Sequence, residues 1–365
     1  MAGIDLHSNN LLCGIVDEEG RRVFEKKLPC DLVQVTRALK PFKKRLDTVA
    51  VESTYNWYWL VDGLQDEGYQ VVLANPAKIT QYDGLKHGDD KSDAFFLAEM
   101  LRLKILPTGH ICDRKLRPVR DLLRRRMGLV HKRTSVMLSL KSLYTRMTGK
   151  QMELRWLKEL EPTEAESLFA DPSDQLIARL DLQLLEQLNQ SVSEIEKAIL
   201  KKVKPISHYQ VLQSMPGVGR ILGLTITLET VDPKRFATAG DYASYCRCVD
   251  SQRLSNGKKK GENNAKCGNK YLAWAFVEAA QFARRHDEAC RQFYDRKAAQ
   301  ANKIVAVKAL ACKLAKAAWH MMSQNQPYDG QRIFPGYKPK EPGQEALETL
   351  AKSLRPEVKK ELGRT

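Results

Sequence analysis

The sequence predicts an α/β domain at its N-terminus and a mostly helical remainder. Short apolar runs typical of strands are confined to residues 1–76, and long runs with helical apolar spacing begin near residue 114. The charge also changes sign along the chain. Residues 1–105 carry 14 Lys and Arg against 16 Asp and Glu, whereas the remainder has a net charge of +18. This division indicates a carboxylate site in the N-terminal region. Basic segments in the remainder of the chain would bring that site to nucleic acid.

The composition excludes several classes of protein. Hydrophobic residues make up 43% of the 365 and charged residues 28%, which is typical of a folded domain rather than a disordered chain. No run of 18 apolar residues and no signal-peptide pattern is present, so no transmembrane helix is expected. The eight Cys are scattered, which favours a reducing, cytoplasmic location. For a nucleic-acid-binding protein, the expected place in the cytoplasm is the nucleoid. The net charge of +16 favours a polyanionic partner, either nucleic acid or an anionic membrane surface, and the partner predicted is nucleic acid and no membrane.

The N-terminal elements follow a recognisable order. Three strands in a meander come first, and then helices and strands alternate. This β-β-β-α-β-α-β-α order is that of the ribonuclease H-like (RuvC-like) fold, and it predicts a domain over 1–108. The expected strands are 2–6, 11–16, 21–28, 47–54 and 69–76, and the expected helices are 31–46, interrupted by Pro41, 55–67 and one from Lys91 onward.

A basic helical region is expected over 109–204. Residues 114–150 hold 12 Lys and Arg and one acid, with apolar residues at helical intervals. From Ile177 to Ile199 the apolar residues are spaced close to a heptad, so the two helices pair with each other or across a dimer. The length of this seam favours a homo-oligomer, either a dimer or a tetramer.

The third region, 205–325, is expected to be mostly helical. Its Pro-Gly-Val-Gly at 216–219 is typical of either a helix-hairpin-helix-like segment or a plain turn between helices. Ala-rich helices are expected over 271–286 and 297–322, with a mobile basic loop over 251–270. The Pro-, Gly- and charge-rich tail, 326–365, is expected to be loosely ordered.

Four acidic residues lie where acids are unusual. Asp5 and Glu52 fall in apolar strands, where burial is costly, and Asp90 and Asp93 share one face at the start of a helix. Together they predict a site for Mg²⁺, or Mn²⁺, since both ions prefer carboxylate oxygens. Asp89 could replace Asp90. The alternative is that all four are ordinary acids at the ends of strands and helices.

Ser255 lies in a cationic segment, SNGKKKG, where a hydroxyl could attack a phosphodiester. The alternative is a solvated basic loop that only touches phosphates. The residues expected to bind nucleic acid are Arg117, Arg120, Arg124, Arg125, Arg126, Lys132 and Arg133 in the basic helix, and Arg253, Lys258, Lys259 and Lys260 around Ser255.

Several short motifs converge on one family. Their order and spacing over about residues 1–323 resemble those of the DEDD transposases of the Piv invertase type. These are insertion-sequence recombinases that pair a RuvC-like domain with a serine-bearing C-terminal domain. The motifs are GID (3–5), VEST (51–54), LANP (73–76), DKSDA (90–94), SMPGVG (214–219), RFATAGDYASY (235–245), SNGKKKG (255–261) and CGNKYL (267–272).

The resemblance implies a catalytic set of Asp5, Glu52, Asp90 and Asp93 with a divalent metal, and Ser255 as the nucleophile that forms a phosphoserine link to DNA. It also implies donor and target DNA as substrates, and a noncoding guide RNA. Asn256 separates the serine from Gly257, whereas the resemblance implies a direct Ser-Gly, and Ser251 is the reserve nucleophile. Ala273 follows Tyr271-Leu272, where the family usually has Arg.

Two other functions fit the same sequence. A RuvC-like, metal-dependent DNA junction nuclease would use water in place of Ser255. A non-catalytic nucleic-acid-binding protein would use the basic segments alone, with the acids in structural roles. Metal-dependent strand cleavage distinguishes the enzymes from the binding protein, and a covalent protein–DNA adduct distinguishes the transposase from the nuclease.

Overall fold

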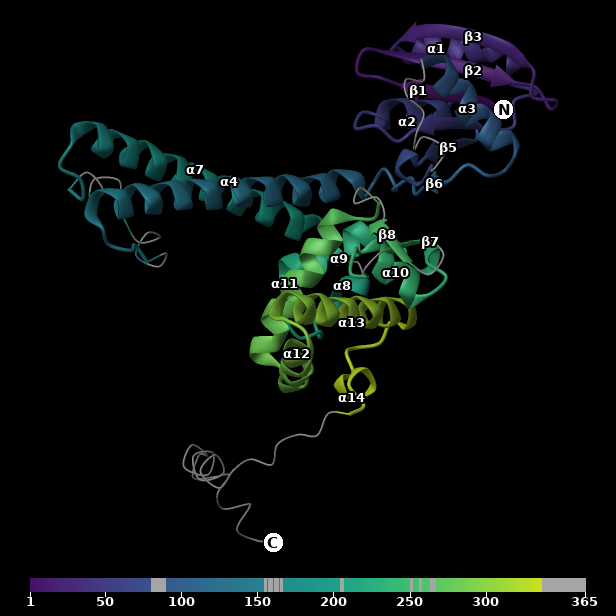
Figure 1. The fold of residues 1–365 in the computed structure, drawn as a ribbon. Coiled ribbons are helices and arrows are strands. Elements are labelled where there is room, and N and C mark those ends of the chain that lie inside the picture. The colour runs from purple at the N-terminus through teal and green to yellow at the C-terminus, as the bar shows by residue number, and fades with distance from the viewer. Residues whose placement is uncertain are drawn as a thin grey trace. The chain divides into compact units, whose positions relative to one another are not determined.

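The protein is described by a computed structural model (Figure 1). The structure describes residues 1–79, 90–153, 156, 160, 164, 167–203, 207–249, 252–255, 258–262 and 267–336, and at 90–92, 203, 207, 252–255 and 259–262 it describes the backbone alone. Two compact units are present. The first comprises Met1–Arg117 and Ser251–Cys267, and the second comprises Pro118–Asp250 and Gly268–Thr365.

The first unit is built on a six-stranded mixed sheet with the strand order β3-β2-β1-β4-β5-β6. The first three strands form an antiparallel meander, β4 and β5 add parallel to β1, and β6 adds antiparallel at the edge. This confirms the predicted mixed α/β N-terminal region and is consistent with a ribonuclease H-like fold. The strands are β1 (Ala2–Leu6), β2 (Asn10–Val16), β3 (Arg22–Pro29), β4 (Val49–Glu52), β5 (Val71–Ala74) and β6 (Thr108–Gly109).

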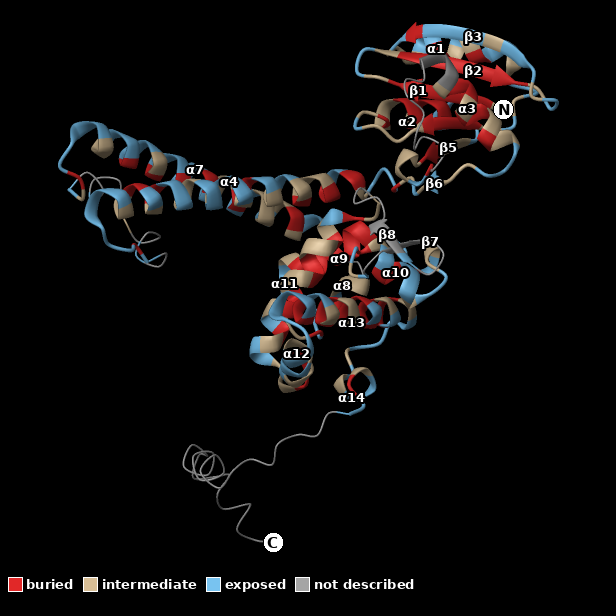
Figure 2. Cartoon of the chain, viewed as in Figure 1, coloured by how far each residue is buried: buried red, intermediate tan, exposed pale blue. Residues whose placement is uncertain are grey.

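Helices cover both faces of this sheet. Ile4 and Val51 point to one face, in a core shared with α1 and α2, whereas Ala50 packs with Leu97 of α3 on the other. The buried strands lie between these layers in Figure 2. Pro41 ends the first expected helix early and places a short 3₁₀ turn there. The elements are α1 (Leu32–Leu39), η1 (Lys40–Phe42), α2 (Tyr58–Asp66), η2 (Pro76–Lys78) and α3 (Asp90–Arg102).

Glycine permits the close approach of α3 to β1. A Cβ atom on Gly3 would lie 2.0 Å from the carbonyl oxygen of Ala94, a distance that no side chain could occupy. The glycine of the GID motif therefore brings the start of α3 against the strand that carries Asp5.

The second unit begins with two long helices that lie side by side (Figure 1). These are α4 (Arg117–Thr148) and α7 (Pro172–Val203). Leu129 of α4 packs with Val192 of α7, and farther along Leu140 packs with Leu182, so the pair is antiparallel. The helical remainder predicted from the sequence is confirmed, and the two helices pair within one chain.

The apolar seam of α7 agrees with the expected one in its C-terminal half, where Leu188, Val192 and Ile199 are buried, and differs from it in the N-terminal half. Its buried positions include Ala178, Leu182 and Leu185, whereas Ile177, Leu180 and Leu184 are 44%, 54% and 46% exposed. The sequence offered two overlapping apolar stripes, and the packing against α4 selects one of them.

The remaining helices form one core around α13, against which α8, α10, α11 and α12 pack. The helix expected over 297–322 is wrong at its start, because residues 297–300 belong to α12 and α13 begins only after Asn302, whose side chain caps it. The elements are α8 (Ser207–Leu212), α9 (Arg220–Thr230), η4 (Pro233–Arg235), α10 (Ala239–Tyr245), α11 (Lys270–His286), α12 (Glu288–Gln300), α13 (Lys303–Gln324) and α14 (Gly330–Ile333).

The Pro-Gly-Val-Gly segment connects α8 to α9. Gly217 has a φ of +79°, and a Cβ atom there would lie 2.1 Å from the carbonyl oxygen of Ala279 in α11. The glycine therefore has a packing role, and a helix-hairpin-helix function for this turn stays a prediction.

A hairpin replaces the loop expected around Ser255. Strand β7 (Gln252–Ser255) pairs antiparallel with β8 (Lys258–Glu262), and Ser255 is opposite Lys258 in the register. Asn256 and Gly257 lie outside the described residues. In the part of the chain that the structure describes, no helix has the length and apolar character needed to cross a membrane. The domain boundaries expected at 108, 204 and 325 stay predictions.

Candidate functional site

Asp5 and Glu52 lie on neighbouring strands and share one face of the sheet. Each alternates with residues that point to the opposite face, such as Ile4 and Val51, so both carboxylates face the layer of α3. Asp5 is 3% exposed. Asp93 lies in the first turns of α3 and acts electrostatically on Glu52. Strand alternation and the position of α3 thus bring three of the four predicted acids together.

The loops that leave β1 and β4 are tied together beside these acids. The side-chain amide of Asn56 donates a 2.9 Å hydrogen bond to the carbonyl oxygen of His7, and Thr54 donates to Asn56. These bonds hold the chain on both sides of the Asp5–Glu52 pair.

The surroundings of Glu52 disfavour its ionisation. Burial raises the pKa of Glu52 to about 8, and the hydrogen bond and charge of Asp5 and the charge of Asp93 add to the effect. His7 Nε2 lies 3.2 Å from Asp5 Oδ2, although neither atom has hydrogen-bond alignment. In this buried pair of carboxylates, Asp5 Oδ2 has no hydrogen-bond partner among the described residues. Carboxylate oxygens of this kind are the ligands that a hard divalent cation requires.

Only the backbone of the fourth acid, Asp90, is described. The backbone of Asp90 belongs to α3, its side chain lies outside the described residues, and Asp89 lies outside them entirely. Among the side chains that are described, no group of three or more His, Cys, Asp or Glu is arranged to hold a metal ion. The four-carboxylate metal set stays a prediction.

Glu52 should make stability depend on pH in metal-free buffer. Its pKa rises from 4.5 to about 8 on folding, so the folded state binds the proton more tightly. The free energy of unfolding should therefore fall as the pH rises from about 4.5 to about 8. Denaturant unfolding in a chelating buffer should show this fall, and Glu52→Gln should flatten it. Glu99→Gln, in the same unit, is the control; an equal fall in wild type and Glu52→Gln would contradict the assignment.

The Ser255 hairpin belongs to the same compact unit as the acids. Just after it, the thiol of Cys267 donates a 3.1 Å hydrogen bond to the carbonyl oxygen of Ala77, which follows β5. Lys258 is exposed, and the side chains of Ser255, Arg253, Lys259 and Lys260 lie outside the described residues. The nucleophilic role of Ser255 stays a prediction.

Several arginines of the basic helix are already engaged within the chain. Arg117 forms a 2.7 Å ion pair with Asp62 and lies over two aromatic rings, and Arg126 forms a 2.6 Å ion pair with Glu196. Arg120 is buried. Arg133 donates to Asn189 on α7. Arg125 and Lys132 are the exposed cations of the predicted set on this helix. Phosphate binding by all seven stays a prediction.

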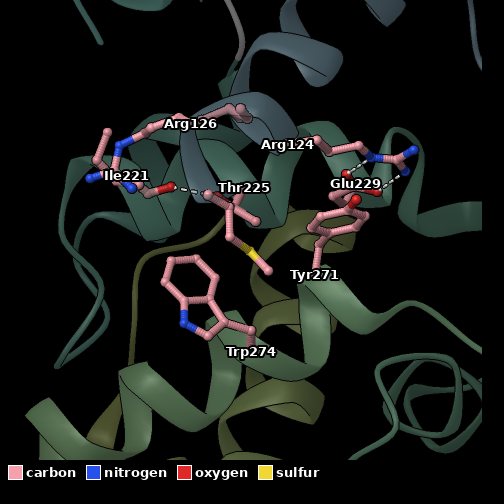
Figure 3. A pocket seen from close by; sticks show the side chains of 9 residues that line it. Arg124, Arg126, Ile221, Thr225, Glu229, Tyr271 and Trp274 are labelled. Atoms are coloured by element: carbon pink, nitrogen blue, oxygen red, sulfur yellow. Dashed lines mark hydrogen bonds and ion pairs between the residues drawn. The ribbon is translucent and has the colours of Figure 1, made fainter. Parts of the chain in front are cut away.

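A buried carboxylate that the sequence analysis did not select lies in the second unit. Glu229 ends α9, and its two oxygens accept hydrogen bonds of 2.7 Å each from Arg124 (Figure 3). Asn269 donates a third bond of 2.7 Å, and Arg124 stacks on Tyr271 at 4.6 Å. We call these four residues the Glu229 cluster. The apolar run ILGLTITL before Glu229 is the same signal that selected Asp5 and Glu52.

The Glu229 cluster connects three segments of the second unit. Asn269 also caps α11 by accepting from the backbone N–H groups of Tyr271 and Leu272, so the CGNKYL motif is anchored to α9 and α4. A small pocket beside the cluster is lined by Arg126, Thr225 and Trp274, among others. The cluster therefore holds the first residues of α11, the helix that follows the Ser255 hairpin in the sequence.

Breaking this ion pair should be costly. Arg124→Met would leave the 2%-exposed Glu229 carboxylate with only a neutral amide partner, and we expect unfolding to become easier by about 3 kcal/mol. The double variant Arg124→Met/Glu229→Gln should recover part of the loss in thermal unfolding. Arg125→Met, one residue away and exposed, is the matched control. Equal stability of Arg124→Met and Arg125→Met would contradict the structural role.

Two parts of the chain match known transposase families. Residues 2–148 match the DEDD transposase domain of the IS110 group, described as "Transposase". Residues 209–295 match the domain described as "Transposase IS116/IS110/IS902 family".

Two individual proteins are similar over most of the chain. One is the "Transposase for insertion sequence element IS1111A" of Coxiella burnetii, 23% identical over 89% of this chain and 90% of its own length. The other is the "Putative transposase y4qE" of Sinorhizobium fredii, 23% identical over 67% of this chain. The match spans 61% of the second protein's length.

Proposed function

We propose that this chain, which carries transposase domains of the IS110/IS116/IS902 families, cuts and rejoins DNA strands at the ends of an insertion sequence. The observation that supports this chemistry most directly is the Asp5–Glu52 pair, with Asp93 close enough to raise the pKa of Glu52. Asp5, Glu52, Asp90 and Asp93 would hold Mg²⁺ or Mn²⁺. Such an ion, when bound, offsets the charge that develops on a phosphate during strand transfer.

Ser255 is the proposed nucleophile. Its Oγ would form a bond to the phosphorus while the bond from phosphorus to the leaving deoxyribose oxygen breaks, and the hydroxyl proton would pass to a base or to solvent. Three features support this role. The sequence places Arg253 before it and three lysines after it, the hairpin belongs to the unit that holds the acids, and Lys258 opposite Ser255 is exposed. Lysines at this place would stabilise the phosphoryl oxygens.

The proposed partners are donor and target DNA and a noncoding guide RNA, in the cytoplasm at the nucleoid. The net charge of +18 after residue 105 supports a nucleic-acid partner. On α4, the exposed Arg125 and Lys132 are the side chains most available to phosphates in the free protein. The arginines bound to Asp62, Glu196 and Glu229 would instead keep α4 in place.

We also propose a dimer or tetramer, since recombination must hold two DNA partners together. The stripe of Ile177, Leu180 and Leu184 on α7 is exposed and suits a second copy of the chain. Changing all three to Ser should lower the mass measured by light scattering, with helix content unchanged. Leu138→Ser on α4, at a residue that is 55% exposed, is the control. A strictly monomeric wild type, with and without nucleic acid, would contradict the proposal.

One experiment separates the candidate functions. The protein is incubated with labelled element-end DNA and adjacent noncoding RNA, with Mg²⁺ or with chelator, and the products are run on a denaturing gel. A metal-dependent protein–DNA adduct supports the transposase. Free cleaved ends that need metal, without an adduct, would favour the RuvC-like junction nuclease. Binding without any cleavage would favour a non-catalytic nucleic-acid-binding protein.

A further inference from the structure

A cluster of cations in the second unit has no role in the sites described above. Arg296 lies on α12, and Lys313 and Lys316 lie one turn apart on the neighbouring α13. We call these three residues the α12–α13 cation cluster. Arg296 and Lys316 are exposed, and Lys313 is half-buried.

Two aromatic rings hold Lys313 in place. Its Nζ lies 5.3 Å from the ring centre of Phe293 and 5.1 Å from that of Phe334, and the two rings are 5.5 Å apart. The guanidinium of Arg296 lies 5.6 Å from the ring centre of Phe293. Cation–π contacts of this kind restrain a flexible lysine and keep its charge at the surface.

The cluster is electrostatically uncompensated. Partial burial lowers the pKa of Lys313, and the charges of Arg296 and Lys316 lower it further. Within the described part of the chain no carboxylate forms an ion pair with any of the three. Some arginines elsewhere in this unit do pair with acids, as Arg124 does with Glu229 and Arg291 with Glu288. Three cations together without an acid destabilise the free protein, and an anion at the same place would remove that cost.

We propose that Arg296, Lys313 and Lys316 bind the phosphodiester backbone of a nucleic acid, at a site additional to α4 and the Ser255 hairpin. Arg296 would supply a planar guanidinium that can donate two hydrogen bonds, and the lysines would supply compact positive charges. These groups suit phosphate oxygens and would not distinguish one base from another. The identification of the polyanion as nucleic acid rests on the proposed function. The backbone could belong to DNA or to RNA, and the two are separated by measurement.

The test uses the full chain and the double variant Arg296→Gln/Lys316→Gln, which keeps Lys313 and both aromatic rings. Binding of a labelled DNA duplex, and separately of a labelled single-stranded RNA, is measured over a series of salt concentrations. The log–log salt slope should fall by about 0.7 to 0.9 for each phosphate that the variant no longer neutralises. The control is Lys297→Gln/Lys303→Gln, which removes the same charge from the same two helices and should leave the slope nearly unchanged.

Thermal unfolding gives a second readout. Because the double variant removes like-charge repulsion, its melting temperature without nucleic acid should equal or exceed that of wild type, although its binding is weaker. Weaker binding of duplex alone identifies DNA as the ligand, and weaker binding of single strand alone identifies RNA. An unchanged slope, or an equal fall in the control, would overturn the site, as would a wild type that binds neither probe.

None of these measurements requires strand cleavage. A protein that shows the slope change but never cuts DNA would keep this site and refute the transposase reaction. A protein that cuts DNA with an unchanged slope would refute only the site.

Discussion

Asp5→Asn should abolish strand cleavage and leave the N-terminal sheet folded. Asp5 lies in the buried strand β1 beside Glu52, where an amide has the same shape but cannot supply the charge that a divalent ion needs. We expect a loss of roughly 10³-fold or more, which corresponds to about 4 kcal/mol of transition-state stabilisation. Glu52→Gln and Asp93→Asn should have effects of the same size, measured as product formed on a denaturing gel.

Stability measurements distinguish loss of the site from loss of the fold. Without metal, each of these variants should be at least as stable as wild type, because one repelling carboxylate has gone. Added Mg²⁺ or Mn²⁺ should raise the melting temperature of wild type but not of Asp5→Asn. Glu19→Gln, in an exposed turn of the same unit, should behave like wild type. Normal cleavage by any of the three site variants would refute the metal assignment.

Ser255→Ala should eliminate the covalent protein–DNA adduct and retain DNA binding. Removal of the hydroxyl deletes the nucleophile, whereas the surrounding lysines still bind phosphate. The expected result is complete loss of the labelled adduct after denaturation, with affinity within about threefold of wild type, or less than about 0.7 kcal/mol.

Ser251→Ala is the matched control, since Ser251 is the other serine of the same segment. An adduct that persists in Ser255→Ala and disappears in Ser251→Ala would move the nucleophile to Ser251. Metal-dependent cleavage that neither change affects would support the water-using nuclease.

Much of the N-terminal domain could be predicted because its signals are local. Strand length, alternation and turn residues predicted the order of the elements along the chain, and apolar runs interrupted by acids selected Asp5 and Glu52. The same rule applied to α9 would also have selected Glu229. The start of α13 also has a local signal, since Asn302 is a common type of N-cap residue. The Ala-rich helical pattern on both sides of Asn302 obscured this signal.

Other features depend on partners distant in the sequence. Composition marked six arginines of α4 as phosphate contacts, yet Arg117, Arg124 and Arg126 are bound to Asp62, Glu229 and Glu196. Periodicity alone could not choose between the two apolar stripes of α7, because the choice depends on which face meets α4. The basic segment around Ser255 was expected to be a mobile loop and pairs as a hairpin.

The sequence by itself determined the types of element, the uneven charge and the identity of the unusual acids, since these follow from residue chemistry at short range. Only the tertiary structure decided which charges are neutralised and which remain available. An isolated arginine is cationic in any context, but its role depends on whether a carboxylate distant in the sequence lies within about 3 Å. That is why Arg124 holds helices together while Arg296, Lys313 and Lys316 have no ion-pair partner among the described residues.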